Sequence, residues 1–199
     1  CYRAEVENLN NCVIFRMSRP GGLKREKPRK QEGKMKWKKE KIKEEKKMVV
    51  LARIDQRLIH GIIVNQWAPA LQVKRFMVVD DILCSNEEVK ASMRMAKPAG
   101  TGVSVISAET AIANFKAGKY DGQRVFVLVK EPETLIRLIE GGVEIPKVDL
   151  GIMFNEDGRT PISKFIALNE KEKEDLETIK GKGIPVVIQY VPTDAEEAY

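Results

Sequence analysis

The single histidine of the chain, His60, lies in a short segment that concentrates side chains suited to phosphoryl chemistry. Arg53, Asp55 and Arg57 precede it and Gly61 follows it directly. A neutral imidazole attacks phosphorus near pH 7 and also leaves again, because its unperturbed pKa is about 6.5. The segment therefore predicts a phosphoryl group carried on His60.

The neighbours of His60 each have a role in such chemistry. A phosphoryl group on nitrogen carries close to two negative charges, and we expect Arg53 and Arg57 to neutralise them through planar, bidentate donors. Gly61 lets the backbone approach closely. Free N–H groups at the start of a helix there would add an anion-binding site. Catalysis would consist mainly of positioning and charge stabilisation.

The other ring nitrogen of His60 needs an acceptor that fixes the tautomer. Three aspartates are candidates: Asp55 in the same segment, and Asp80 and Asp81 after the second expected strand. The sequence leaves the choice among them open. It also leaves open a purely structural His60, since a lone histidine after the apolar pair Leu58-Ile59 is often a buried or capping residue.

Neither a metal nor a cofactor is expected. The three cysteines, Cys1, Cys12 and Cys84, have neither a disulfide-framework nor a metal-ligand spacing, which indicates a reducing, cytoplasmic setting. The Gly-rich fingerprints of nucleotide sites are also absent from the sequence. A metabolite-binding α/β domain with a structural His60 is nevertheless kept as an alternative function.

The elements that must position His60 follow from alternating sequence patterns. Short β-branched runs bounded by Gly, Pro or Asp predict strands, at 49–54, 73–79, 102–106, 124–129, 148–153, 162–167 and 184–191. Helical spacing occurs between several of them, at 61–71, 86–97, 108–117, 132–139 and 170–180. Ser107 and Asn169 are the expected N-caps of two of these helices.

This alternation predicts an α/β fold with a single open, mostly parallel sheet and helices on both of its faces. In such sheets, chemistry gathers in the loops at the carboxyl ends of the strands. His60 follows the first strand, so it stands where an active site is expected. No apolar run reaches the roughly 18 residues that a membrane span needs.

Residues 1–47 differ sharply in composition from the rest. They hold 16 basic and 7 acidic residues, a net charge of +9, whereas residues 48–199 have a net charge of −3. We expect a disordered basic extension, or a frayed charged helix over 34–47. A second hypothesis is that Met48 is the natural start and that 48–199 is the native domain. A nucleic-acid-binding arm is disfavoured, because interleaved aromatics and a recognised module are missing.

The string Ala52-Arg-Ile-Asp-Gln-Arg-Leu-Ile-His-Gly61, with Trp67 after it, closely resembles the opening of the IIB components of the mannose/fructose/sorbose family of phosphotransferase systems (PTS). The resemblance continues through later segments and covers essentially all of 48–199, but none of 1–47. The segments that carry it lie at 78–81, 98–100, 130–132, 138–143 and 158–160.

The resemblance implies a cytoplasmic protein, associated with the membrane through its partners. His60 would accept phosphate on Nδ1 from a phospho-IIA (EIIA) protein or domain, with Arg53, Asp55 and Arg57 around it. The phosphate would then pass to a hexose held by the membrane components IIC and IID (EIIC/EIID). No cofactor is implied. A homodimer and a regulatory paralogue that only senses phosphorylation both stay open, as does the identity of the sugar.

Three positions depart from the family's pattern. Gln56 stands where the family often has a second Asp, Ile62 where it commonly has Gln, and Ile152 where it commonly has a second Gly. The last departure bears on how closely the loop after 148–150 approaches the phosphate. Trp67 is expected in the core rather than at a partner contact. Arg159 either faces the site or anchors a Gly-Arg-Thr-Pro turn.

Overall fold

The computed structural model describes residues 8–9, 12–13 and 48–199. The chain divides into two units, Cys1–Lys39 and Glu40–Tyr199. In the first unit, β1 (Asn8–Leu9) and β2 (Cys12–Val13) form an antiparallel pair. This pair was not predicted, because two-residue strands are too short to show a period in the sequence. The expectations of disorder or of a charged helix over 34–47 fall outside the described residues.

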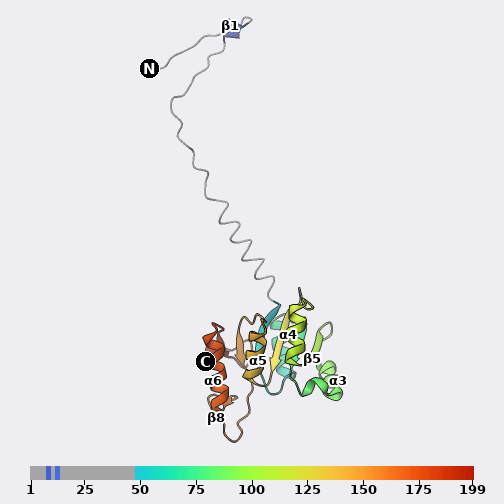
Figure 1. The fold of residues 1–199 in the computed structure, drawn as a ribbon, viewed down its shortest axis with the longest axis vertical. Helices are drawn as coiled ribbons and strands as arrows, with labels where there is room; N and C mark the ends of the chain where they lie inside the picture. Colours follow the sequence, from blue (N-terminus) through green and yellow to red (C-terminus); the bar gives the residue numbers. More distant parts are fainter. Residues whose placement is uncertain (1–7, 10–11, 14–47) are drawn as a thin grey trace, which may run out of the picture. The chain divides into compact units, whose positions relative to one another are not determined.

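A seven-stranded sheet forms the centre of the second unit (Figure 1). Its order is β11-β10-β7-β3-β6-β4-β5, and all neighbours are parallel except β11, which runs antiparallel to β10. The strands are β3 (Val49–Ile54), β4 (Arg75–Val79), β5 (Gly102–Ile106), β6 (Val125–Val129), β7 (Val148–Leu150), β10 (Val186–Ile188) and β11 (Glu197–Ala198). The predicted open, mostly parallel sheet is confirmed.

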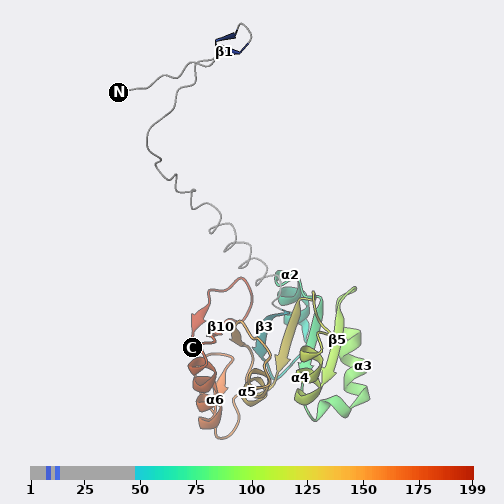
Figure 2. The same ribbon diagram turned by 45° about the horizontal axis from the view of Figure 1, so that its top comes forward.

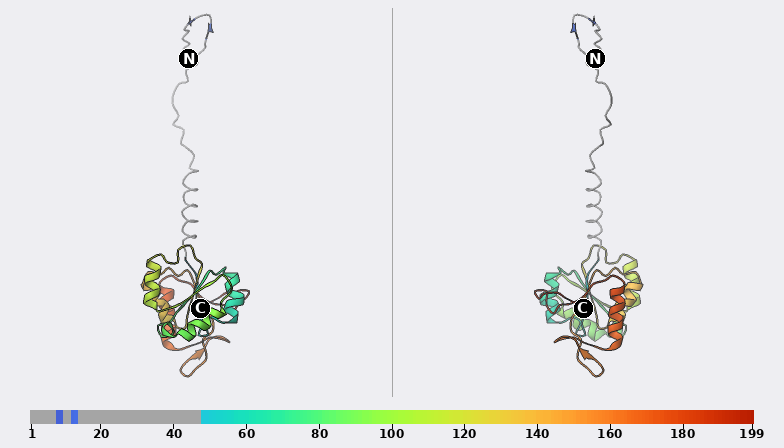
Figure 3. Two further views of the ribbon diagram at one scale, coloured as in Figure 1. Left: turned by 90° about the vertical axis from the view of Figure 1, so that its right-hand side faces the viewer. Right: turned by 90° about the vertical axis from the view of Figure 1, so that its left-hand side faces the viewer.

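Helices lie on both faces of this sheet, as predicted (Figure 3). They are the π-helix η1 (Ile63–Trp67), α2 (Ala68–Ala70), the 3-10 helix η2 (Leu83–Ser85), α3 (Glu87–Ala96), α4 (Ala108–Lys116), α5 (Pro132–Glu140) and α6 (Glu170–Gly181). Two helices begin at the expected caps. The Ser107 side chain accepts a hydrogen bond from Thr110 N, and Asn169 forms a capping box with Glu172.

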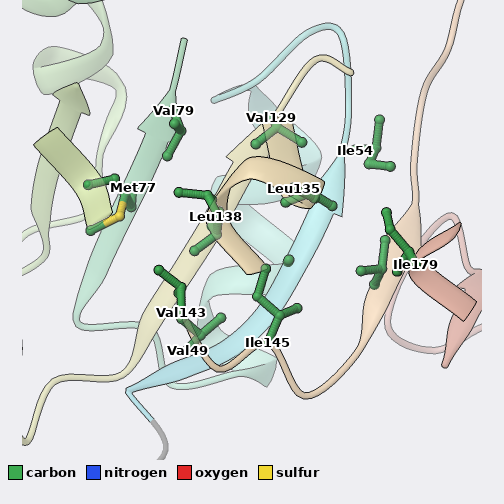
Figure 4. Close-up of a cluster of buried hydrophobic side chains, with 14 of the residues drawn as sticks. Val49, Ile54, Met77, Val79, Val129, Leu135, Leu138, Val143, Ile145 and Ile179 are labelled. Atoms are coloured by element: carbon green, nitrogen blue, oxygen red, sulfur yellow. The ribbon is translucent and has the colours of Figure 1, made fainter. Parts of the chain in front are cut away.

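Each face of the sheet has its own apolar core. On one face, α4, α5 and α6 pack against the central strands, and Leu135 and Leu138 of α5 lie over Val129 of β6 (Figure 4). On the other face, Ile63 and Trp67 of η1 pack with side chains of β4 and β6. Because β3 lies inside the sheet, between β7 and β6, its alternate side chains enter both cores (Figure 2).

One predicted strand, at 162–167, is wrong. The chain instead forms a short hairpin of β8 (Thr160–Pro161) and β9 (Ala167–Leu168), whose two strands pair antiparallel. Ile162 is exposed, and its N–H donates to the Ile166 carbonyl within the turn. The apolar run at 162–167 therefore reflects a turn followed by a buried strand. In the part of the chain that the structure describes, no helix is long and apolar enough to cross a membrane.

Candidate functional site

The loop between β3 and η1 is a tight turn with a strained residue. Leu58 N donates to Asp55 O at 2.9 Å, which closes the turn. Leu58 has a φ of 54°, a left-handed conformation that is rare outside glycine, while its side chain is buried in the core beside η1. Such conformations persist where the surrounding structure enforces them. Burial of Leu58 thus fixes the path of the chain toward His60.

Asp55 is the centre of the polar contacts in this loop. Its Oδ2 accepts from Arg53 Nε at 3.2 Å and lies 3.1 Å from His60 Nε2, while its Oδ1 accepts from the Arg57 backbone N–H at 3.1 Å. An ionised carboxylate only accepts hydrogen bonds, so this geometry assigns the imidazole proton to Nε2. His60 Nδ1 then keeps its lone pair.

His60 Nδ1 is nearly enclosed. The atom is buried and has no hydrogen-bond partner among the described residues, and the side chain is 8% exposed. A buried lone pair without a donor is rare in folded proteins, and it marks either strain or a function. To attack phosphorus the ring must first be uncovered. His60 is also the residue before the helix, since its carbonyl accepts from Val64 N at 3.0 Å.

Arg53 is buried completely beneath this loop. Besides Asp55, its guanidinium donates from Nη1 to Asp149 Oδ2 and to the Gln189 carbonyl (2.8 Å), and Nη2 lies 3.4 Å from the Tyr190 carbonyl. Its Cζ atom also lies 5.0 Å from the centre of the Trp67 ring, a cation–π contact. The donors of Arg53 are thus directed at protein groups, which supports a role in holding Asp55.

Asp149, the partner of Arg53 on β7, has an unusual environment. Burial raises the pKa of Asp149 to about 7, and the attraction of Arg53 offsets only part of that rise. Oδ1 of Asp149 is buried without a partner among the described residues. This residue was missed in the sequence. A charged residue between two buried apolar ones, Val148 and Leu150, was the signal that could have identified it.

The raised pKa of Asp149 predicts an unusual pH dependence of stability. Between about pH 4 and pH 7 the folded chain holds a proton that the unfolded chain releases, so this group stabilises the fold less as pH rises. We expect the free energy of unfolding of the parent, minus that of Asp149→Asn, to fall by up to about 1.4 kcal/mol per pH unit in this window. Urea unfolding of both proteins at several pH values would measure it; a difference that rises with pH would contradict the assignment.

Gly151 allows the chain after β7 to pass close to Arg53. Its N–H donates to the Ile54 carbonyl at 2.8 Å, which ties the loop to the end of β3. A Cβ atom built on Gly151 would lie 2.6 Å from Arg53 Cζ, well inside van der Waals contact. The first glycine of the family's Gly-Gly pair is therefore required by packing. The second position is Ile152, which is buried beside the loop.

Gly151→Ala is expected to lower the free energy of unfolding by about 2–3 kcal/mol, because the guanidinium is held by several partners and cannot move aside without breaking them. Chemical denaturation would measure this loss. Gly181→Ala is the matched control, since no atom lies within 4 Å of its added Cβ, and a helical Gly→Ala change is stabilising by up to about 1 kcal/mol. Equal stability of the two variants would contradict the packing argument.

Arg57 is the cation of the segment that faces solvent. Its side chain is exposed and forms neither a hydrogen bond nor an ion pair with any residue that the structure describes. It borders a cavity of about 310 Å³ whose wall includes Ile152, Phe154, Phe165 and Tyr190. Phe165 and Tyr190 are stacked, with ring centres 4.1 Å apart. The site thus combines one buried and one available arginine.

The two aspartates after β4 lie away from His60. Asp80 Oδ1 accepts from Ile82 N and Leu83 N, and its Oδ2 lies 3.4 Å from Lys130 Nζ. Asp81 accepts from Ala108 N at the start of α4 and from Arg137 Nη1 at 2.5 Å, which lowers its pKa. Because β6 separates β4 from β3, neither takes the position beside Nε2 that Asp55 holds. A role for them in orienting phosphate stays a prediction.

Other residues singled out in the sequence have structural contacts. Trp67 is buried, as expected, and its Nε1 donates to the Tyr190 carbonyl at 3.2 Å. Arg159 anchors its turn, donating to the Phe154 carbonyl and to Glu172. Gln56 Oε1 accepts from Phe154 N at 2.7 Å, so this departure from the family's pattern ties the His60 loop to the segment after β7. Gly61 is exposed at the helix start, with space around it.

Residues 49–199 match the family model described as "PTS system sorbose subfamily IIB component". Among curated proteins, the chain is 32% identical to the PTS system fructose-specific EIIB component of Bacillus subtilis (strain 168), over 76% of this chain and 93% of that protein. It is 33% identical to the PTS system mannose-specific EIIAB component of Escherichia coli (strain K12), over 74% of this chain. The match spans only 46% of that protein.

Solved structures agree with these relatives. The N-acetylgalactosamine-specific IIB component 1 from Escherichia coli superposes with a TM-score of 0.71 at 29% identity, over 76% of this chain and 99% of that one. The IIBSor domain of the sorbose permease from Klebsiella pneumoniae gives a TM-score of 0.72 at 27% identity, over 75% and 92% of the two chains.

Proposed function

The chain belongs to the sorbose subfamily of PTS IIB components, and from this premise we propose that it relays a phosphoryl group on His60, from a phospho-IIA donor to a sugar. Membership implies phosphoryl transfer within a sugar phosphotransferase system. The observation that carries the assignment to His60 is the 3.1 Å contact between Asp55 Oδ2 and His60 Nε2. It leaves Nδ1 as the nucleophilic nitrogen.

In the first step, the Nδ1 lone pair attacks the phosphorus of a phosphohistidine on the donor. A P–N bond to His60 forms and the donor's P–N bond breaks, its electron pair returning to the donor's imidazole. Asp55 holds the Nε2 proton throughout and stabilises the positive charge that develops on the ring. Arg57, exposed and without a protein partner among the described residues, would neutralise the transferred phosphoryl oxygens.

In the second step, a sugar hydroxyl oxygen attacks the phosphorus, the P–N bond breaks, and its electrons return to Nδ1. The hydroxyl proton passes to solvent. We propose that the acceptor is a hexose held by membrane components of the IIC and IID type, and that the chain acts at the cytoplasmic face of the membrane. The relatives' names include mannose, fructose, sorbose and N-acetylgalactosamine, so the proposal extends to hexoses as a class.

Incubation of the full chain with phosphoenolpyruvate, the general phosphotransferase proteins and a family IIA tests the proposal. The expected product contains one acid-labile, base-stable phosphate, which mass spectrometry of its peptides places on His60. Passage of the label to a hexose in membranes that contain IIC and IID would complete the sequence of steps. An unphosphorylated chain beside an active IIA would overturn the relay.

Arg57→Gln is expected to slow phosphate uptake by roughly 10–100-fold, because the variant loses a charge-assisted, bidentate contact to the phosphoryl oxygens. The free energy of unfolding should change by less than about 0.5 kcal/mol, since the side chain is exposed. Stopped-flow or quenched-flow transfer from phospho-IIA would measure the rate.

Arg94→Gln on α3 is the matched control for Arg57→Gln, because it removes the same charge from an exposed arginine whose nearest partner, Glu87, lies 3.9 Å away. Transfer to this variant should match the parent. If Arg57→Gln and Arg94→Gln both transfer at the parent's rate, Arg57 has no part in binding the phosphoryl group.

A further inference from the structure

Asp149 lies in the middle of β7, directly opposite Arg53 of β3. Its strand neighbours, Val148 and Leu150, point into the core beneath α5 and α6. Side chains alternate across a strand, so Asp149 points to the other face, where the Arg53 guanidinium lies. Both side chains are fully buried. The Arg53 guanidinium therefore contacts two carboxylates, those of Asp149 and Asp55.

The two carboxylates divide the guanidinium between them. Asp55 receives the Nε proton, and Asp149 receives a proton of Nη1. Nη1 lies on the Cδ side of the guanidinium, away from the Nε proton, so the two carboxylates hold the planar group from different directions. Here Asp55 takes one N–H from Arg53, and its oxygens stay available to His60 Nε2 and to the Arg57 backbone N–H.

We propose that Asp149 is a positioning residue for phosphoryl transfer: by anchoring Nη1 of Arg53, it fixes the guanidinium so that its Nε–H stays on Asp55 Oδ2 and Asp55 stays on His60 Nε2. This inference rests on the proposed relay function. Asp149 contacts neither His60 nor, by this account, the phosphoryl group. It acts through Arg53 and Asp55.

The surroundings of Asp149 support a role that depends on its charge. The charged groups that act on it are Arg53 across the sheet and Lys147 in its own segment. Burial raises its pKa to about 7. Its Oδ1, buried without a partner among the described residues, is placed to carry the proton of the neutral form. Protonation would weaken its hold on Arg53, so the arrangement around His60 is coupled to pH.

Asp149→Asn in the full chain is the test, since asparagine has the same shape and keeps an oxygen acceptor for Arg53 but has no charge. We expect transfer from phospho-IIA to be about 10–100-fold slower, in line with losses seen when a second partner behind a functional histidine is removed. Nitrogen-15 NMR should show the neutral His60 ring mainly as the Nε2–H tautomer in the parent and as a mixture in the variant. A purely structural role would not change the tautomer.

Asp175→Asn on α6 is the matched control, because it makes the same chemical change at a residue outside the network of Arg53. The transfer rate and the tautomer ratio of this variant should equal those of the parent. If Asp149→Asn does not fold, Asp149→Ser takes its place with the same readouts. Parental transfer with a parental tautomer ratio in a folded variant overturns the positioning role. If the parent itself takes up no phosphate, the proposed relay function is wrong. The comparison of the His60 tautomers in the parent and the variant by NMR then still tests the role of Asp149.

Discussion

His60→Gln is expected to take up no phosphate from phospho-IIA. The glutamine amide nitrogen can replace Nε2 as a donor to Asp55, so the loop should keep its hydrogen bond at this position. The amide lacks a nucleophilic lone pair, however, since that pair is delocalised into the carbonyl. Transfer measured with radiolabelled phosphoenolpyruvate should fall below detection, while the free energy of unfolding should change by no more than about 1 kcal/mol.

The parent chain, assayed beside the variant with the same IIA preparation, shows that the donor is active. Acid-labile phosphate on His60→Gln at the parent's rate would mean that another side chain is the acceptor. Loss of both label and folding would point to a structural histidine, the alternative that the sequence left open. The two functions are therefore separated by measuring unfolding and transfer on the same samples.

Asp55→Asn is expected to slow transfer by roughly 10²–10⁴-fold. An asparagine at this position can present its oxygen or its NH₂ group to Nε2, so the proton of the ring is no longer held on that nitrogen, and the positive charge that develops during attack is no longer stabilised. The fold should survive above pH 7, where Asp149 is ionised and stays as a charged partner for Arg53. Single-turnover transfer from phospho-IIA gives the rate directly.

Asp121→Asn, at an exposed turn position, is the control for Asp55→Asn and should transfer at the parent's rate. The His60 ring can also be followed by nitrogen-15 NMR in the Asp55 variant. A variant that keeps the Nε2–H tautomer and the parent's rate would show that another group orients His60. Asp80 and Asp81, the alternatives in the sequence, would then have to be reconsidered.

The fold was largely predictable because its strands are buried, apolar runs that are bounded by Gly, Pro or Asp. The limits of β3 and β5 agree with the apolar runs at 49–54 and 102–106. The failure at 162–167 has a physical reason. Ile162 belongs to an exposed turn and Ala167 to a buried strand, and an apolar run does not distinguish these environments.

The site was predictable only where its residues are close in the sequence. His60, Asp55 and Arg57 come together through one loop, and their roles follow from their chemistry. Apart from Asp55, the hydrogen-bond partners of Arg53 come from β7 and from the segment after β10, more than ninety residues away. Strand order brings them together, and the sequence pattern does not reveal that order. Arg53 therefore looked like a phosphate ligand, whereas its donors are directed at protein groups.

The π-helix after His60 bears on how the site tolerates changes in chain length. In η1 the Ala68 N–H bonds to the Ile63 carbonyl, five residues back, where an α-helix would span four. One residue could be deleted between these anchors, and the same donor and acceptor would then close an ordinary α-turn. The helix could thus lose one residue, whereas the loop from Asp55 to His60 could not, because it is closed by the Leu58–Asp55 turn and by the contact between Asp55 and His60.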